Sequence, residues 1–164
     1  MKKEIERKFL VEYLPNLENV SAVKIEQSYL SLNPEIRIRR EGDKFFYTEK
    51  SEGTLVRNEN NQEINKITYL KLKEKKIGNT IYKTRYKLQL KNELVAEIDI
   101  YEDYLEGLMV VEVEFPNLKE AKDFVIPPYF GKEITKDKKF KNKNLSQINS
   151  LDEFKTKTLI KRMH

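Results

Sequence analysis

Residues Glu4-Ile5-Glu6-Arg7-Lys8 form the stretch of sequence that decides the fold. In an extended strand, successive side chains point to opposite faces of the sheet. The two glutamates and the lysine therefore share one face, and Ile5 lies on the other. Two carboxylates beside an ammonium group can hold a divalent cation and a phosphate together. Because the solvated outer face of an ordinary strand can carry the same residues, the other strands must be considered together with this one.

The composition excludes several kinds of site. The chain has 164 residues, and we expect a single domain over residues 1–164, long enough to bury its own core. It has no cysteine and one histidine, His164, so a disulfide framework, a thiolate nucleophile and a histidine-ligated zinc site are excluded. Any metal must then be a hard ion bound by oxygen, such as Mg²⁺ or Mn²⁺.

The distribution of charge makes nucleic-acid binding an unfavoured function. Charged residues make up 36% of the chain, but 32 basic and 27 acidic side chains leave a net charge of only +5. Acids and bases are mixed within single segments, whereas nucleic-acid-binding proteins usually gather bases on one face. The lysine-rich run between Lys136 and Lys143 is expected to be a solvated segment. No apolar run is long enough to span a membrane and no signal-peptide pattern is present, so a cytoplasmic location without a membrane partner is expected.

Alternation with a period of two residues dominates the chain and predicts a closed antiparallel barrel. Eight strands are predicted, at residues 3–11, 23–31, 35–41, 44–50, 54–63, 80–88, 94–101 and 108–115. Helices are predicted at 66–76, from Asn117, and in a C-terminal segment of about 143–164 that becomes helical from about residue 151. Short connections between eight strands suit a barrel, which has no exposed sheet edge. The predicted class is α+β, an eight-stranded antiparallel β-barrel with helices packed on its outside.

Charged residues fall in the same phase within these strands, opposite faces that are largely apolar. The aligned bases are Lys8, Arg37, Arg39, Lys50, Arg57, Lys83 and Arg85. The aligned acids are Glu4, Glu6, Glu59, Glu63, Glu97, Asp99, Glu112 and Glu114. If the apolar faces form the interior, the charges are surface pairs worth about 0.2–1 kcal/mol each. If the apolar faces point outward, the charged faces line a hydrated lumen. Because acids and bases are nearly equal in number there, few buried charges would be left unpaired, and the free-energy cost of burying them stays small. The residues alone leave both arrangements open.

The chain resembles the CYTH superfamily, the triphosphate tunnel metalloenzymes, and in particular its small bacterial members of inorganic triphosphatase type. The resemblance begins with the ExExK signature at residues 4–8 and covers nearly the whole chain. The further motifs, in order, are Gln27-Ser28-Tyr29-Leu30, Arg37-Ile38-Arg39, Thr48-Glu49-Lys50, Arg57-Asn58-Glu59, Lys83-Thr84-Arg85-Tyr86, Glu97-Ile98-Asp99, Glu112-Val113-Glu114-Phe115 and the tail from Pro128 to Asn142. One such motif is weak evidence, whereas this many in the right order and phase are specific.

The resemblance implies a charged tunnel that hydrolyses a triphosphate, above all inorganic tripolyphosphate, to diphosphate and phosphate with Mg²⁺ or Mn²⁺. It implies that Glu4, Glu6 and Glu114 hold one metal ion, and that Glu59, Asp99 and Glu112 hold a second ion or position the attacking water. It implies these phosphate-binding residues: Lys8, Arg37, Arg39, Lys50, Arg57, Lys83 and Arg85. The implied catalytic residues are Lys8, Lys83, Glu59, Asp99 and Glu112.

One departure from the family pattern keeps other functions open. Many relatives read Arg-x-Glu-x-Glu in the fifth strand, but here the last acid is replaced by Asn61. An amide retains an oxygen ligand without the charge, which should weaken a second metal site. The alternatives are a class IV-type adenylate cyclase that makes cyclic AMP from ATP, a thiamine triphosphatase, or a polyphosphate-binding protein with little turnover. A homodimer is possible, and it would have to form through outer faces or helices because a barrel has no free edge.

Overall fold

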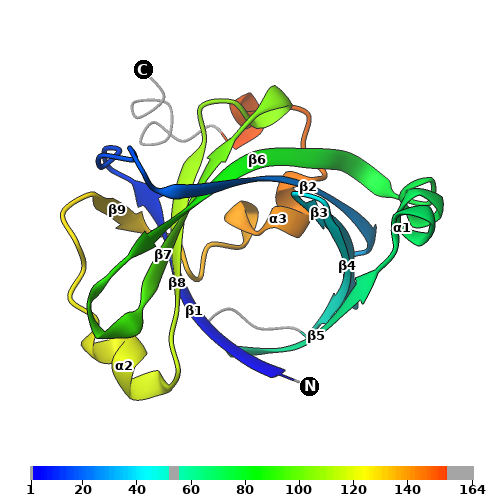
Figure 1. The fold of residues 1–164 in the computed structure, drawn as a ribbon. Coiled ribbons are helices and arrows are strands. Elements are labelled where there is room, and N and C mark those ends of the chain that lie inside the picture. The colour runs from blue at the N-terminus through cyan, green and yellow to red at the C-terminus, as the bar shows by residue number, and fades with distance from the viewer. Residues whose placement is uncertain (1, 52–55, 155–164) are drawn as a thin grey trace.

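The computed structural model describes residues 2–51 and 56–154 of the chain, and their strands form one antiparallel sheet. The nine strands are β1 (Lys2–Val11), β2 (Ser21–Ser31), β3 (Glu35–Glu41), β4 (Lys44–Lys50), β5 (Val56–Ile64), β6 (Ile77–Gln89), β7 (Val95–Tyr101), β8 (Met109–Glu114) and β9 (Phe130–Glu133). Their order is β5-β4-β3-β2-β6-β7-β8-β1-β9, and an additional pairing of β5 with β1 closes the first eight into a barrel (Figure 1). The predicted eight-stranded barrel is therefore confirmed, and β9 extends the sheet beyond β1.

The strand bounds follow the alternation of the sequence closely. Strands β3 and β4 have the predicted ranges, because Asn33-Pro34 and the turn at Gly42 delimit them on either side. Strand β6 begins earlier than predicted, and it includes Gly78, where we expected helix α1 to stop. Gly78 has a φ of +70°, and a Cβ placed on it would lie 2.5 Å from the carbonyl oxygen of Ser146. Glycine is therefore required there by a close approach of the chain as well as by its backbone conformation.

Residues 2–51 and 56–154 include three short α-helices in the connections between and after the strands. They are α1 (Lys66–Lys73), α2 (Leu118–Asp123) and α3 (Asn142–Leu145), with 3₁₀ turns at Lys91–Glu93, Asp103–Leu105, Lys138–Phe140 and Leu151–Phe154. Asn65 is the N-cap of α1, and its Oδ1 accepts a 2.8 Å hydrogen bond from the Thr68 amide. The predicted C-terminal helix is described only as the turn at Leu151–Phe154, and residues 155–164 of that prediction lie outside the described residues. No helix in the described part of the chain is long and apolar enough to cross a membrane.

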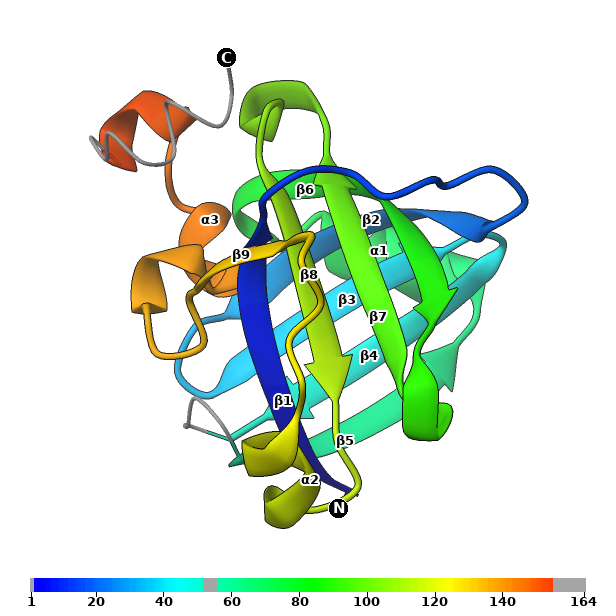
Figure 2. The same cartoon turned by 90° about the vertical axis from the view of Figure 1, so that its left-hand side faces the viewer.

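The apolar faces of the strands point outward, which settles the choice that the sequence left open. Buried Ile5, Ile98 and Val113 form a cluster on the outer faces of β1, β7 and β8, beneath Ala121 of α2 (Figure 2). Across the barrel, Tyr69 of α1 packs on the outward-facing residues of β3 and β4. Because these faces are covered from outside, the charged faces are left to line the interior.

Residues 134–151 pack across one end of the barrel, and α3 is seen within the ring of strands (Figure 1). Phe140 and Leu145 join the apolar cluster at this end. Polar anchors hold the segment: Tyr104 donates to the carbonyl of Leu145 at 2.8 Å, and the Asn79 amide donates to the carbonyl of Ile148 at 2.9 Å. The sequence predicted a solvated lysine-rich segment here. The segment forms a cap over this end of the barrel, and none of its lysines is buried: Lys136 and Lys138 are exposed, and Lys139, Lys141 and Lys143 are partly exposed.

Candidate active site

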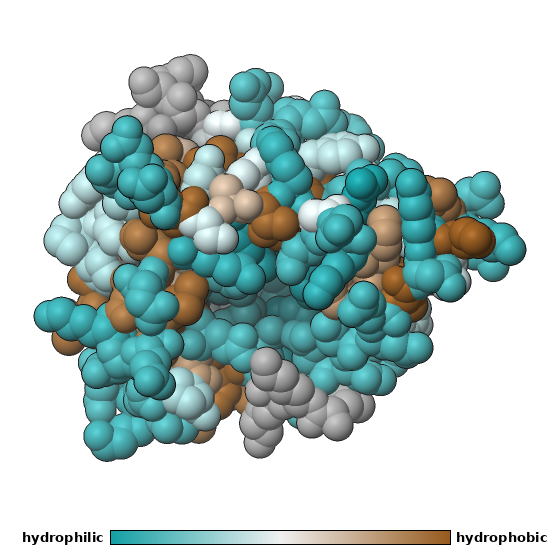
Figure 3. Space-filling view, in the orientation of Figure 1, coloured by the Kyte–Doolittle hydropathy of each residue, from teal (hydrophilic) through white to brown (hydrophobic). Residues whose placement is uncertain are grey.

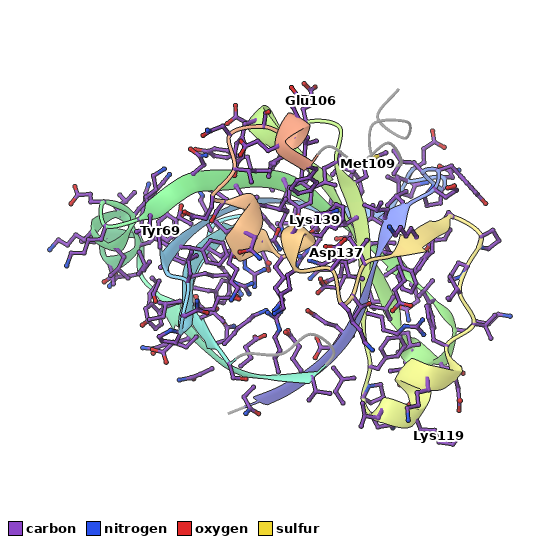
Figure 4. The ribbon with its side chains drawn as sticks, turned by 180° about the vertical axis from the view of Figure 1, so that it is seen from behind. Tyr69, Glu106, Met109, Lys119, Asp137 and Lys139 are labelled. Carbon is purple, nitrogen blue, oxygen red and sulfur yellow. The ribbon has the colours of Figure 1, made fainter. Side chains whose placement is uncertain are left out.

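A charged cavity of about 250 Å³ fills the inside of the barrel, and the space-filling view shows a hydrophilic hollow at its centre (Figure 3). All seven residues expected to bind phosphate line this cavity. The expected metal ligands that line it are Glu4, Glu6, Glu59, Glu112 and Glu114. The cap supplies the floor through Ile134, Thr135, Asp137, Phe140, Lys141 and Asn142. Seen from behind, Asp137 and Lys139 lie close together at the cap, with 3.7 Å between Lys139 Nζ and Asp137 Oδ2 (Figure 4).

Carboxylates gather on one wall, which is formed by β1, β5 and β8. Glu6 lies directly opposite Glu114 across the β1–β8 ladder, and the Glu6 side chain also hydrogen-bonds to Glu112. Burial and the nearby charge of Glu112 raise the pKa of Glu6 well above its ordinary value. Glu4 and Glu59 form a second hydrogen-bonded pair, in which burial and Glu4 raise the pKa of Glu59. The carboxyl groups on this wall therefore lie close enough to raise the pKa of Glu6 and Glu59.

Two basic side chains reach into this carboxylate wall. Arg57 Nη2 lies 3.3 Å from Glu4 Oε1 and 3.0 Å from Glu6 Oε1. Lys50 Nζ lies 3.2 Å from the same Glu4 oxygen and 3.6 Å from Glu59 Oε2. Both cations are largely buried, so they offset much of the repulsion among the acids.

Arginines form the opposite wall, and their positive charge is only partly compensated. Arg37 and Arg39 project inward from β3, and no group in the described ranges accepts a hydrogen bond from the Nε of either. Burial, together with the nearby charges of Arg37 and Arg85, lowers the pKa of Arg39 to about 9. A buried guanidinium in a field of like charge is stabilised by an anion, and phosphate oxygens match its planar donors.

Asp99 lies behind this wall rather than on the surface of the cavity. It is only 4% exposed, and its carboxylate accepts two hydrogen bonds from Arg85, at 2.8 Å and 3.0 Å. Lys83 Nζ forms an ion pair with Asp99 Oδ2 at 2.8 Å. Burial outweighs the attraction of Asp99 and, with Arg85, lowers the pKa of Lys83 to about 7. Asp99 therefore holds two of the expected phosphate-binding side chains in place.

Several cavity residues were not singled out from the sequence. Glu35 and Glu41 lie in the same phase of β3 as Arg37 and Arg39, so the alternation could have identified them. The floor residues of the cap could not be found in this way, because their segment has no strand period. Asn61, the departure from the family pattern, is exposed and lies outside the lining of the cavity. Its Oδ1 accepts a 2.6 Å hydrogen bond from Thr48.

The carboxylate wall is chemically suited to a hard divalent cation. All of its ligand atoms are carboxylate oxygens, and the mutual repulsion that raises the pKa of Glu6 and Glu59 would be relieved by a cation. In the described part of the chain, no three acidic groups already converge as a metal-binding cluster. Arg57 and Lys50 stand between the acids instead, so a metal ion would have to take over their contacts.

Comparisons with known proteins agree with this architecture. A scan against protein-family models finds no match. An inorganic triphosphatase of Nitrosomonas europaea is 41% identical over 146 residues, which cover 87% of this chain and 96% of that protein. An inorganic triphosphatase of Acetivibrio thermocellus is 33% identical over 153 residues, covering 88% and 94%. A crystal structure of an inorganic triphosphatase superposes with a TM-score of 0.69 at 38% identity, covering 92% of this chain and 98% of that one.

A closed barrel with charged faces turned inward is the triphosphate tunnel architecture. A putative adenylate cyclase from Bacillus halodurans shares this fold at only 16% identity, with a TM-score of 0.55 over 95% of this chain and 100% of that one. Sequence identity to the triphosphatases is much higher and extends over nearly their full length. The chain belongs to the inorganic triphosphatase family of the CYTH-like tunnel fold.

Proposed function

We propose that the protein hydrolyses inorganic tripolyphosphate to diphosphate and phosphate inside the tunnel, with Mg²⁺ or Mn²⁺ held by the carboxylate wall. The observation that carries the proposal is the division of the cavity into two facing walls. Buried arginines that lack full compensation lie on one wall, and clustered carboxylates lie on the other. A polyphosphate with its counter-cation carries both charges that these walls require. The names of the full-length relatives support the same activity.

In this proposal, the arginine wall binds and orients the phosphate chain. Arg37 and Arg39 offer planar donor pairs to phosphate oxygens, and Arg85 lies beside them with its guanidinium fixed by Asp99. Lys8, Lys50 and Lys83 supply further positive charge as phosphoryl oxygens gain charge in the transition state. Asp99 lies behind the surface of the cavity and forms ion pairs with both Lys83 and Arg85. It therefore acts as a positioning residue for these two side chains.

On the opposite wall, Glu4, Glu6 and Glu114 would hold the metal ion, and Glu59 and Glu112 would support a second ion or orient water. When bound, such an ion supplies charge neutralisation and lowers the pKa of a coordinated water. The carboxylates would fix the side of the phosphate chain on which water can approach, and they would hold the cation in their deprotonated form. Phosphoryl transfer needs little beyond this orientation and neutralisation, so the lack of a histidine base is no obstacle.

The size and lining of the cavity favour an inorganic substrate over a nucleotide. Organic ligands usually occupy pockets of about 300–1,000 Å³ lined mostly by apolar and aromatic groups. This cavity measures about 250 Å³, and its lining is almost wholly charged or polar, with Phe140 and Ile134 as apolar members. A short phosphate chain suits this space, whereas a nucleobase would find little apolar surface to stack on.

Phosphate release from tripolyphosphate, ATP and thiamine triphosphate should be measured side by side with Mg²⁺, Mn²⁺ or EDTA. We expect release from tripolyphosphate that requires the metal, and at least about tenfold slower release from ATP, because the cavity lacks a base-binding surface. The products should be diphosphate and phosphate in equal amounts. Conversion of ATP to cyclic AMP and diphosphate would indicate a cyclase, and tight binding of tripolyphosphate without turnover would indicate a binding protein.

A further inference from the structure

Arg57 occupies an unusual position, because its guanidinium contacts three carboxylates through two different nitrogen atoms. Nη2 lies 3.3 Å from Glu4 and 3.0 Å from Glu6, which are the proposed metal ligands on β1. Nη1 lies 3.5 Å from Glu35, which projects from β3, separated from β5 by the single strand β4. Glu6, Glu35 and Glu4 together raise the pKa of Arg57 despite its burial, so its charge is permanent.

We propose that Arg57 acts as an internal cation that is exchanged for the metal ion, with Glu35 retaining Arg57 after the exchange. The guanidinium neutralises Glu4 and Glu6 while the tunnel is empty. Binding of a divalent cation to these two glutamates displaces Nη2, and the contact of Nη1 with Glu35 draws the side chain toward β3. Metal binding thereby delivers Arg57 to the arginine wall that takes the phosphate chain. This inference rests on the proposed function, because it gives Glu4 and Glu6 the role of metal ligands.

The exchange follows from the distances. A metal such as Mg²⁺ binds carboxylate oxygens at about 2.1 Å, while Arg57 Nη2 lies 3.0 Å from the same Glu6 oxygen. Arg57 Nη2 bridges Glu4 Oε1 and Glu6 Oε1, and a metal ion that bridges the same two oxygens cannot share this position with it, since the two cations would nearly touch and repel one another. The displaced guanidinium cannot lose its proton, and an unpaired buried charge would be costly. It therefore needs a carboxylate that does not bind the metal.

Glu35 meets this requirement. It is a buried carboxylate, 7% exposed, and it forms an ion pair with Nη1, whereas the ion pairs of Glu4 and Glu6 with Arg57 in the described structure involve Nη2. Losing the Nη2 contacts therefore leaves this contact intact. Glu35 stands two residues before Arg37 on the same face of β3, so a guanidinium that moves toward it approaches the arginine wall. In this scheme Glu35 is a positioning residue that acts through Arg57.

The test is the affinity of the substrate-free protein for Mn²⁺, measured by electron paramagnetic resonance or calorimetry without any triphosphate. Arg57→Met removes the competing cation, and we expect Mn²⁺ to bind at least about tenfold more tightly. Glu35→Gln removes the carboxylate that retains Arg57, and we expect Mn²⁺ to bind about tenfold more weakly. Glu41→Gln is the matched control, because Glu41 lies on the same face of β3 and loses the same charge without a contact to Arg57. It should change the affinity by no more than about twofold.

A double variant separates this role from general electrostatics. In the Arg57→Met background, Glu35→Gln should lower the Mn²⁺ affinity no more than Glu41→Gln does, because the arginine that Glu35 retains has been removed. The inference is overturned if Arg57→Met leaves Mn²⁺ affinity unchanged, or if Glu35→Gln matches Glu41→Gln in the native background. Thermal melting confirms that each variant is folded, and Glu35→Asp, with its shorter reach, replaces Glu35→Gln in the cycle if the latter does not fold. The binding assay contains no triphosphate, so failure here and failure of hydrolysis are observed separately.

Discussion

Replacing Glu6 by Gln is expected to abolish tripolyphosphate hydrolysis while leaving the melting temperature unchanged or higher. Glu6 is buried, and burial and Glu112 raise its pKa well above the ordinary value, so its negative charge is disfavoured in the folded state without a metal ion. A neutral amide of the same shape therefore costs little in the folded state and relieves repulsion on the carboxylate wall. It cannot supply the negative ligand that a divalent cation requires. We expect turnover to fall by at least about 100-fold.

Steady-state phosphate release and thermal melting of Glu6→Gln test this prediction together. Glu49→Gln is the matched control, because Glu49 lies exposed on the outer face of β4, where it accepts a 2.9 Å hydrogen bond from Tyr47. That variant should keep native turnover. If Glu6→Gln unfolds the protein, Glu6 is a structural ion-pair partner of Arg57. If it retains native turnover, the proposed metal ligand is wrong.

Asp99→Asn is expected to have the largest effect on stability. The variant would leave Lys83 and Arg85 buried without the carboxylate that both of them contact. Breaking a buried ion pair by removing one partner typically costs about 3–5 kcal/mol. Chemical denaturation at pH 7 should show a loss of this size. Asp123→Asn is the control, because its pair with Lys119 is exposed and should contribute less than about 1 kcal/mol.

The same ion pairs predict an acid transition in the native protein. Although burial opposes its charge, Arg85 and Lys83 hold the pKa of Asp99 well below its ordinary value. The folded state then binds fewer protons than the unfolded state, whose aspartate pKa is about 3.9. The stabilisation by Asp99 is therefore fully present above that pH and is lost as the pH falls toward the folded pKa. Asp99→Asn should remove this part of the pH dependence, and an unchanged acid denaturation curve would contradict the assignment.

The sequence predicted the barrel and most of its lining because one period controls both. A strand that alternates acid or base with an apolar residue fixes which side chains share a face, and closure of the sheet places those faces together. Alternation alone put Glu4, Glu6 and Arg37 on charged strand faces, and the family resemblance was needed to predict that these faces line one lumen. Glu35 follows the same phase and was accessible to the same reasoning.

Cross-strand detail could not be obtained in this way. Asp99 has the correct phase for the lumen, but only the register that sets it opposite Arg85 shows that it supports the wall from behind. The cap is also invisible to periodicity, since α3 has only four residues and β9 is as short. These segments are held by contacts with residues far away in the sequence, such as Asn79 with Ile148. The secondary-structure propensity of a short stretch of sequence contains no information about such long-range contacts.

The cap at one end of the barrel has a consequence for substrate entry and product release. Ile134, Thr135, Asp137, Phe140, Lys141 and Asn142 line the cavity at this end, so among the described residues they narrow it there, and we expect exchange mainly through the opposite end. Substrate and products must then use the same passage in turn. The product that lies nearer the cap dissociates last. If diphosphate dissociates slowly, it prevents the next substrate molecule from binding. The floor therefore makes the rate of emptying, as much as the cleavage step, a determinant of how fast this enzyme can work.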